Sequence, residues 1–343
     1  MTYKNILIVK LSAIGDVIHA LPVARALKQT YPDARITWVV EKPAYDLLTN
    51  NPDIDEIIIF DKPKFKSLTG LLSNGYRLSK LLKSHHFDLA IDLQGLFKSA
   101  TISYLSGAPK RLVYCNAREL SDKIGQRICG KHENGHVVDR YLDVAQHLGC
   151  KIDQVQFPMN ITEVEAQKAE AIANHAGLRL ENPYVVLAPG TNWPSKCWPT
   201  THFAKLADQL YDTNIVPVII GGPNDKRLAE EIIANTKIPP IDLTGKTSLK
   251  QLAYIIKKSQ TFVGGDTGPM HLAVAVGAKI VTIFGPTDPK RNGPYGENHS
   301  ILTPVVPCIC CWKRQCTNTP MCLETVHADV VYEAIGNKMK VGS

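Results

Sequence analysis

The chain has no apolar run long enough to cross a membrane. None of its uninterrupted apolar stretches reaches the roughly 18 residues that a membrane-spanning helix requires. Residues 1–9 lead directly into a strand-like run, without the charged start and small-residue cleavage site of a secretory signal. We therefore expect a cytoplasmic protein, free or attached peripherally to the inner face of the cytoplasmic membrane.

Charge of one sign is not strongly in excess either. Lys and Arg number 39 against 32 Asp and Glu, which gives a net charge of +7. This excess is too mild to indicate a nucleic-acid partner, but it suits an anionic substrate or an anionic membrane surface. A hydrophobic content of 44% and a charged content of 21% describe an ordinary globular protein, and 343 residues suffice for two domains.

Several common catalytic signatures are also missing. The chain contains no Gly-x4-Gly-Lys-Ser/Thr loop, and no Gly-x-Gly-x2-Gly follows its first strand-like run. These absences argue against an ATPase and a NAD-dependent enzyme. It also has no Gly-x-Ser-x-Gly and no metal-holding Asp-x-Asp at a strand end.

Short apolar runs alternate with helical patterns along the whole chain. The runs lie at 6–9, 36–40, 56–60 and 89–93, and again at 184–188, 215–220, 261–263 and 279–284. Such alternation indicates an α/β protein with doubly wound parallel sheets. We expect an N-terminal domain over 1–155, a C-terminal domain over 156–325 and a tail over 326–343. Functional loops at the strand ends of both halves favour two domains that face a central cleft.

The segment from Val263 to Ala273 offers what a phosphate group needs. A strand stops at Gly264-Gly265 and a helix begins near Gly268, so backbone N–H groups can point at an anion. Thr267 adds a hydroxyl, and His271 lies in the first helical turn. The alternative is an ordinary strand-to-helix turn, in which Asp266 or Thr267 serves only as a cap.

Three further strand-end residues can carry chemistry. Asp16 follows the first strand and can act as a general base, although an Asp at a helix start is commonly only a cap. Lys196 can neutralise charge on a leaving diphosphate. Asp225 can accept hydrogen bonds from ribose hydroxyls, and a structural role in its turn fits equally well.

Basic residues follow several strands of the first half. Lys62, Lys64 and Lys66 are interleaved with Pro and Phe after the run at 56–60. Lys98 and Arg118 follow later strands. These side chains can bind an anionic acceptor, because ligands of such folds bind at the carboxyl ends of the strands. A solvated lysine loop is the alternative for the first three.

Five of the nine cysteines lie within 15 residues. In a cytosolic protein such a cluster indicates metal or redox chemistry more than a secretory disulfide framework. Cys308, Cys311, Cys316 and Cys322, with Cys310 as an extra, can hold a structural zinc ion, form disulfides or remain free. Their spacing is not that of a common zinc finger.

Five motifs in order resemble those of the lipopolysaccharide heptosyltransferases of glycosyltransferase family 9. The resemblance runs from about residue 4 to about residue 325. The motifs are Lys10-Leu11-Ser12-Ala13-Ile14-Gly15-Asp16 with His19 and Pro22, Asp92-Leu93-Gln94-Gly95 with Lys98, Ala117-Arg118-Glu119, Ala188-Pro189-Gly190-Thr191 with Lys196 and Trp198-Pro199, and Gly265-Asp266-Thr267-Gly268 with His271 and Phe284-Gly285-Pro286-Thr287-Asp288-Pro289. The loop Asn192-Trp193-Pro194 departs from the pattern of close relatives of the first heptosyltransferase.

The resemblance implies a GT-B architecture of two Rossmann-like domains, with the acceptor on the first and the sugar nucleotide on the second. It implies inverting, metal-independent transfer of L-glycero-D-manno-heptose from ADP-heptose to the Kdo or heptose of the lipopolysaccharide inner core. Asp16 would then be the catalytic base, and Lys196 would contact the donor. The remaining donor residues would be Thr191, Asn192, Asp225, Asp266, Thr267, Gly268 and His271.

On the acceptor side, the resemblance implies that Lys62, Lys64, Lys66, Lys98 and Arg118 meet the phosphates and carboxylates of a Kdo–lipid A acceptor. It requires no catalytic cofactor, and zinc at the cysteines would be structural. We expect a monomer, although no feature of the sequence decides the oligomeric state. A family-9 enzyme with another sugar nucleotide or glycan acceptor remains an alternative. An inactive nucleotide-sugar-binding protein is less favoured, because Asp16 and Lys196 are both present.

Overall fold

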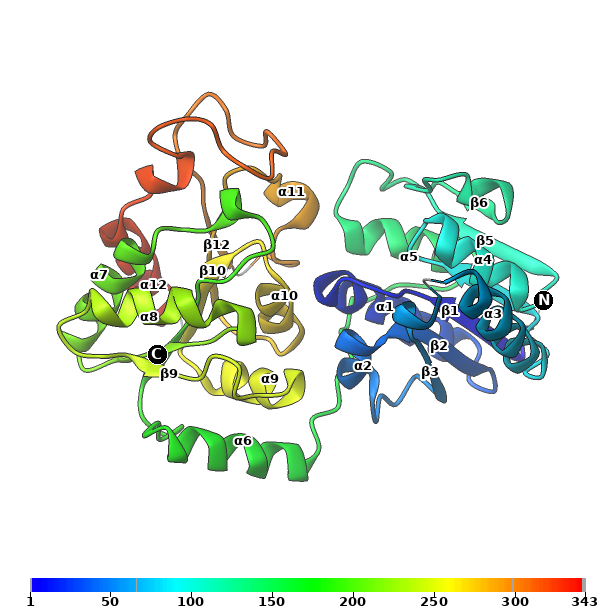
Figure 1. Ribbon diagram of the computed structural model, residues 1–343, viewed down its shortest axis with the longest axis horizontal. Helices are drawn as coiled ribbons and strands as arrows, with labels where there is room; N and C mark the ends of the chain where they lie inside the picture. Colours follow the sequence, from blue (N-terminus) through cyan, green and yellow to red (C-terminus); the bar gives the residue numbers. More distant parts are fainter. Residues whose placement is uncertain (1, 66, 298, 341–343) are drawn as a thin grey trace. The chain divides into compact units, whose positions relative to one another are not determined.

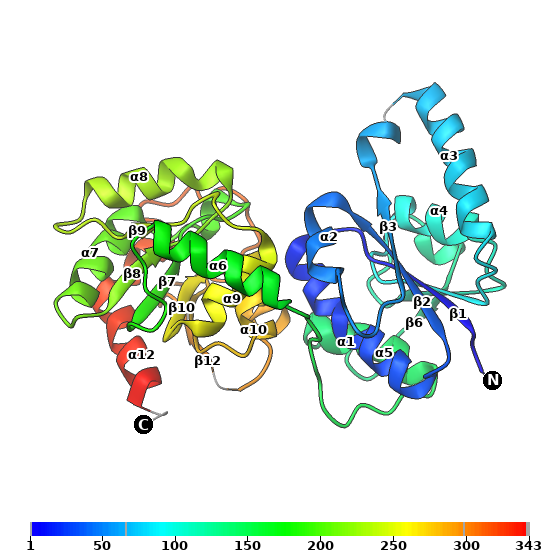
Figure 2. The same ribbon diagram turned by 90° about the horizontal axis from the view of Figure 1, so that it is seen from below.

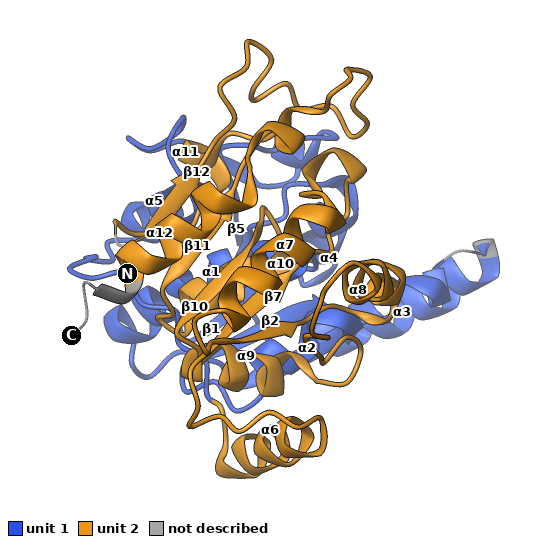
Figure 3. Cartoon of the chain, turned by 90° about the vertical axis from the view of Figure 1, so that its left-hand side faces the viewer, with its two compact units in different colours: residues 1–160 blue, residues 161–343 orange. Residues whose placement is uncertain are grey.

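A computed structural model describes residues 2–65, 67–297 and 299–340, and the structural statements below concern these residues (Figure 1). The chain divides into two compact units, unit 1 over residues 1–160 and unit 2 over residues 161–343 (Figure 3). The boundary therefore lies a few residues beyond the expected 155/156. The expected separate tail over 326–343 is instead part of unit 2, because its helix packs onto that unit's core.

Unit 1 contains a six-stranded parallel sheet with the order β3-β2-β1-β4-β5-β6. Four strands are almost fully buried, which explains why they appear in the sequence as continuous apolar runs. The strands are β1 (Asn5–Val9), β2 (Arg35–Glu41), β3 (Glu56–Phe60), β4 (Leu89–Asp92), β5 (Lys110–Tyr114) and β6 (Gln126–Ile128). The helices are α1 (Ile14–Thr30), α2 (Lys42–Leu48), α3 (Leu68–Lys83), α4 (Phe97–Leu105) and α5 (Val137–His147), with 3-10 turns η1 (Lys62–Phe65) and η2 (Ser121–Lys123).

Unit 2 contains a second six-stranded parallel sheet, with the order β12-β11-β10-β7-β8-β9. Its strands are β7 (Tyr184–Ala188), β8 (Val216–Ile219), β9 (Ile241–Asp242), β10 (Thr261–Gly265), β11 (Ile280–Ile283) and β12 (His299–Leu302). Its helices are α6 (Glu163–His175), α7 (Thr200–Tyr211), α8 (Lys226–Ala234), α9 (Leu249–Lys258), α10 (Gly268–Ala275), α11 (Pro289–Asn292) and α12 (Ala328–Lys340), with 3-10 turns η3 (Pro194–Lys196), η4 (Pro223–Asp225) and η5 (Cys322–Thr325).

Helices cover both faces of each sheet, so the strands are buried on both sides. In unit 1, α1 and α5 pack together, whereas Leu7 and Val9 contact a cluster that includes Leu82 of α3 (Figure 2). In unit 2, Val185 and Leu187 belong to a cluster formed with α7 and α12. Helix α6 begins where Thr162 and Glu165 form a capping box.

The two sheets share one topology, in which the strand order reverses direction between the first strand and the fourth. In unit 1 this switch point lies between β1 and β4, and in unit 2 it lies between β7 and β10. In such sheets ligands bind beyond the carboxyl ends of the strands at the switch point. Within the described ranges, no helix is long and apolar enough to cross a membrane.

Candidate active site

In unit 2, the turn from β10 to α10 needs its glycines because the backbone is crowded there. A Cβ atom on Gly264 would lie 3.1 Å from both the Cβ and the carbonyl oxygen of Ala188. A Cβ atom on Gly265 would lie 3.1 Å from the carbonyl oxygen of Lys196. The Thr267 hydroxyl caps α10 by accepting from the Met270 N–H at 3.4 Å. The end of β10 therefore packs closely against the loop that carries Lys196, and helix α10 begins next to this contact.

Asp266 lies between the Lys196 ammonium and the His271 ring at this turn. Its Oδ2 accepts a hydrogen bond from Lys196 Nζ at 2.6 Å, and its Oδ1 lies 3.7 Å from His271 Nε2. Burial raises the pKa of Asp266, but the neighbouring His271 ring and the Lys196 charge outweigh it and hold the pKa at about 2. Asp266 is therefore a permanently charged acceptor that Lys196 partly neutralises.

The Lys196 ammonium is also held against an aromatic ring. Its Nζ lies 4.4 Å from the centroid of Trp193, which contacts Arg314 on the 308–322 segment at 5.4 Å. The Lys196 side chain is 14% exposed, so it is desolvated without being sealed off. A cation in this position interacts strongly with an incoming anion, because little water screens it.

The other predicted donor residues lie at the ends of neighbouring strands. Thr191 donates its hydroxyl to the Trp193 carbonyl oxygen at 2.6 Å, and the Asn192 side chain is exposed. Asp225 accepts from the Gly222 N–H at 2.7 Å, and its carboxylate covers Gly190 so closely that a Cβ there would lie 2.3 Å from it. The structure thus places Thr191 and Asp225 beside the ends of β7 and β8, with part of their hydrogen-bonding capacity used within their own loops.

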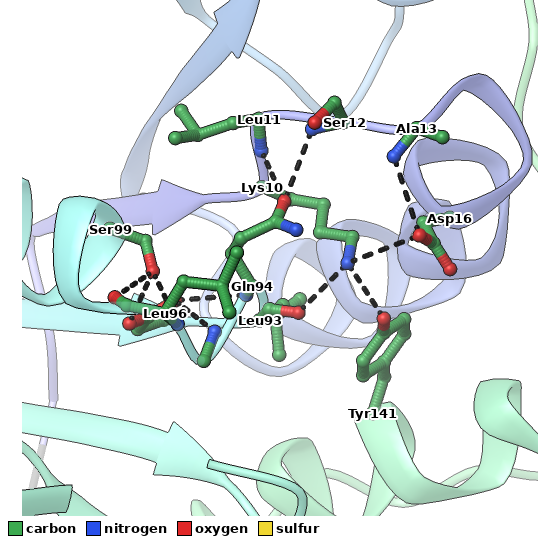
Figure 4. A network of polar contacts seen from close by, with 12 residues as sticks. Lys10, Leu11, Ser12, Ala13, Asp16, Leu93, Gln94, Leu96, Ser99 and Tyr141 are labelled. Atoms are coloured by element: carbon green, nitrogen blue, oxygen red, sulfur yellow. Dashed lines mark hydrogen bonds and ion pairs between the residues drawn. The ribbon is translucent and has the colours of Figure 1, made fainter. Parts of the chain in front are cut away.

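In unit 1, Lys10 and Asp16 lie at the switch point between β1 and β4 (Figure 4). The Lys10 side chain is 2% exposed, and its Nζ donates to the Tyr141 hydroxyl at 2.8 Å and the Leu93 carbonyl oxygen at 3.1 Å. Asp16 Oδ2 lies 4.0 Å from that ammonium and accepts from the Ala13 N–H at 3.3 Å. The Asp16 side chain is 44% exposed, so its carboxylate remains accessible to a substrate.

Burial lowers the pKa of Lys10, and the charges of Asp16 and Asp92 oppose that shift. Asp92 accepts from the N–H groups of Gln94 and Gly95 at 2.8 and 2.9 Å. Burial nevertheless raises the pKa of Asp92 to about 6. Gln94 Oε1 in turn accepts from the N–H groups of the loop residues Leu11 and Ser12, both at 3.1 Å. Gln94, which follows β4, therefore holds the loop that precedes α1 in place.

The structure separates the predicted basic acceptor residues into two groups. Lys98 donates to Glu41 at 2.7 Å, and both Lys98 and the exposed Arg118 are near enough to lower the pKa of Lys10. Lys62 and Lys64 lie on η1 after the edge strand β3, where Lys64 pairs with Asp61 at 3.0 Å. Lys66 lies outside the described residues. Lys98 and Arg118 are thus close enough to Lys10 for their charges to act on it.

The residue pattern predicts no role for Lys10, Tyr141 or Trp193. The one sequence signal for Lys10 is its place directly after a fully buried strand, where a lysine has little access to solvent. Nothing in the sequence connects Tyr141 to it, since 131 residues separate the two. The Trp193 ring was noted only as a departure from the family pattern.

Two Rossmann-like units in one chain, each with a six-stranded parallel sheet, give the protein the GT-B fold. Residues 75–322 match the family model described as glycosyltransferase family 9 (heptosyltransferase). The chain therefore belongs to glycosyltransferase family 9.

Individual relatives agree with this assignment. The lipopolysaccharide heptosyltransferase 1 of Pseudomonas aeruginosa is 29% identical over 326 residues, which cover 92% of this chain and 88% of the relative. A family-9 glycosyltransferase from Veillonella parvula superposes with a TM-score of 0.86 at 24% identity, covering 99% of this chain and 98% of its own. The E. coli ADP-heptose lipopolysaccharide heptosyltransferase II gives a TM-score of 0.81 at 23% identity, covering 98% and 99%. The resemblance, the α/β fold and the enzyme class predicted from the sequence are confirmed.

Proposed function

We propose that this protein transfers a heptosyl group from ADP-heptose to the inner core of lipopolysaccharide, with inversion at the anomeric carbon. The heptosyltransferase family and the relative from Pseudomonas aeruginosa support this donor and acceptor class. One observation carries the proposal: charged groups lie at both switch points, a carboxylate (Asp16) in unit 1 and the group Lys196–Asp266–His271 in unit 2.

Unit 2 would hold the donor. The diphosphate would take hydrogen bonds from Lys196 and from the first N–H groups of α10, where the helix dipole also favours negative charge. Asp266 and Thr267 would accept from and donate to heptose hydroxyls, with His271 and Gly268 beside them. Thr191 and Asn192 would line the nucleotide, and Asp225 would accept from the ribose. These residues supply the cationic charge that a leaving diphosphate requires, so we propose catalysis without a metal ion.

Unit 1 would supply the base. Asp16 would take the proton of an acceptor hydroxyl while that oxygen bonds to the anomeric carbon. The bond from the anomeric carbon to the β-phosphate oxygen breaks at the same time, and ADP leaves with the electron pair beside Lys196. One displacement inverts the anomeric centre. The buried Lys10 ammonium, 4.0 Å from Asp16 Oδ2, would help to hold the carboxylate in place.

The acceptor would be an anionic lipid. Arg118 and Lys98 lie near Lys10 and would bind the Kdo carboxylates or phosphates of the acceptor. Lys62, Lys64 and Lys66 would contact the more distant phosphates. Because such an acceptor is part of a membrane, the protein would work at its inner face.

A donor and acceptor panel tests the proposal. ADP-heptose, UDP-hexoses and GDP-mannose are each incubated with Kdo–lipid A and with heptosyl-Kdo–lipid A, and products are identified by mass spectrometry. We expect transfer from ADP-heptose alone. Transfer from a hexose nucleotide in its place would show a family-9 enzyme of another specificity, and no transfer combined with ADP binding would show an inactive nucleotide-sugar-binding protein.

The role of Asp16 has its own test. Asp16→Asn keeps an oxygen that accepts from the Ala13 N–H but cannot take up a proton. We expect its kcat to fall by about 100-fold to 10,000-fold, the usual contribution of a general base, with ADP affinity nearly unchanged in calorimetry. A variant that turns over normally would refute the assignment.

A further inference from the structure

Four of the five clustered cysteines line one small cavity in unit 2. Cys308, Cys311, Cys316 and Cys322 surround a cavity of about 40 Å³, together with Ser195 and Asn318. The fifth, Cys310, lies apart from that lining, and its thiol faces the Thr287 carbonyl oxygen at 3.8 Å. The fold thus selects a set of four thiols whose sequence spacing is Cys-x2-Cys-x4-Cys-x5-Cys.

The surroundings of the cavity suit thiolates. Asn318 donates an N–H to the Cys308 sulfur at 3.4 Å, the kind of hydrogen bond that supports thiolate ligands of metal ions. All nine cysteines are free thiols in the structure.

The thiols surround the cavity without being arranged around a common point. In the part of the chain that the structure describes, no group of three or more His, Cys, Asp or Glu side chains has the geometry of a metal site. Each sulfur is positioned by a single side-chain torsion with three staggered minima. Rotation about these torsions is the movement that an incoming ion would require.

The segment with these cysteines is fixed to two loops of the candidate active site. The N–H groups of Cys310 and Trp312 donate to the carbonyl oxygens of Gly285 and Pro286, both at 2.8 Å. On the other side, the Ser195 hydroxyl donates to the Lys313 carbonyl oxygen at 2.6 Å, and the Ser195 N–H donates to Arg314 at 3.2 Å. Ser195 is directly followed by Lys196.

We propose that Cys308, Cys311, Cys316 and Cys322 bind one soft divalent cation, with zinc the first choice, and that the bound ion stabilises the Lys196 loop through Ser195. Four thiolates are a complete ligand set for tetrahedral zinc, so the site is closed and structural. The ion takes no part in the transfer reaction. The proposal concerns unit 2 alone and does not depend on the donor or acceptor.

Metal content provides the test. The wild-type protein, Cys311→Ser, Cys316→Ser and the control Cys310→Ser are purified without chelator, and metals are measured by inductively coupled plasma mass spectrometry. We expect one equivalent of zinc per chain in the wild type and in Cys310→Ser, and at least about a tenfold loss in the other two. Equal contents in all four proteins, or a wild type without metal and with disulfides in the intact mass, would overturn the proposal.

A second measurement covers variants that fail to fold. Wild-type protein is stripped with chelator and titrated with Co²⁺, whose absorption distinguishes tetrahedral thiolate ligation from oxygen ligation. We expect the thiolate bands to saturate at one equivalent. Absence of these bands would refute the site.

Hydrogen exchange tests the connection to Lys196. We expect chelation to increase amide exchange in peptides covering 308–322 and 190–198, while peptides from α8 stay unchanged. Unchanged exchange over 190–198 would refute the positioning role. None of these readouts requires catalytic activity.

Discussion

The Lys10 ammonium lies 4.0 Å from Asp16 Oδ2 and is almost completely buried, whereas the carboxylate is 44% exposed. The ammonium is held from behind by the Tyr141 hydroxyl and the Leu93 carbonyl oxygen. The ammonium group therefore lies next to Asp16 and is shielded from bulk solvent. This one-sided arrangement makes Lys10 a positioning residue for the proposed base.

Lys10→Met should lower kcat and leave ADP affinity nearly unchanged. The variant removes the charge that lies 4.0 Å from the Asp16 carboxylate, so the proposed base loses the group that holds it in place. It also leaves two buried partners of the ammonium unsatisfied, which costs about 1 to 3 kcal/mol of unfolding free energy. Steady-state kinetics, calorimetry with ADP and urea unfolding measure these effects.

Tyr141→Phe is the matched control for Lys10. It removes the 2.8 Å hydrogen bond to the ammonium but keeps both the charge and the ring, which lies 5.0 Å from Nζ. We expect a loss of about 1 kcal/mol in stability with kcat nearly unchanged. An equal loss of kcat in both variants would assign the effect to packing and not to charge.

The contributions of the Lys196–Asp266 ion pair to stability and to ADP binding should be separable by mutation. Lys196→Met leaves the Asp266 carboxylate with one cationic neighbour fewer, and we expect a loss of about 2 kcal/mol. Adding Asp266→Asn should restore part of that stability, because a neutral amide needs no cation. ADP affinity should fall at least tenfold in the single variant and stay low in the double variant. Restored ADP affinity in the double variant would contradict a direct contact between Lys196 and the diphosphate.

The same pair makes the stability dependent on acid pH. Asp266 has a folded pKa of about 2, below the ordinary aspartate value of 3.8. Its contribution is therefore present above about pH 4 and is lost as the pH falls towards 2, by about 2 kcal/mol in all. The difference in unfolding free energy between the wild type and Asp266→Asn should shrink over that interval. A constant difference would show that Asp266 is not held ionised by its neighbours.

The sheets could be predicted because buried parallel strands appear as continuous apolar runs. The apolar runs that precede Lys10 and Gly190 form buried strands, β1 and β7, as predicted. Helix α5 begins at Val137 because the side chain of His136, an uncommon cap, accepts a hydrogen bond from the Val138 N–H. Local chemistry of that kind is weakly encoded in residue patterns.

The pairings inside the sites could not be predicted in the same way. Lys196 and Asp266 are 70 residues apart and meet because β7 and β10 are neighbours, a fact of strand order and not of spacing. A buried Lys10 contradicts the usual exposure of lysine and depends on partners from β4 and α5. The sequence shows which residue types are present, and the functional roles proposed for Lys196 and Asp266 stay predictions.

Asp92 should make stability depend on pH with the opposite sign. Its folded pKa of about 6 exceeds the ordinary aspartate value of 3.8, so the folded state binds a proton more tightly than the unfolded chain. The unfolding free energy should therefore fall as the pH rises from about 4 to about 6, by roughly 3 kcal/mol at most. Urea unfolding at several pH values should show this slope in the wild type. Its persistence in Asp92→Asn would assign it to another group.

Gly190 should tolerate no side chain. A Cβ there would lie 2.3 Å from the Asp225 carboxylate, which would have to move and break its 2.7 Å hydrogen bond from the Gly222 N–H. We expect Gly190→Ala to cost about 1 to 3 kcal/mol and to raise the KM for the donor, since the displaced Asp225 is the proposed ribose ligand.

The control for this substitution lies in α12 of the same unit. A Cβ on Gly336 would meet nothing within 4 Å, so Gly336→Ala should stabilise the helix by up to about 1 kcal/mol and leave the KM unchanged. Adding Asp225→Ala to Gly190→Ala should remove the clash and recover stability, but the KM should stay raised. If the double variant regained the wild-type KM, Asp225 would be a turn residue only and the ribose would be bound elsewhere.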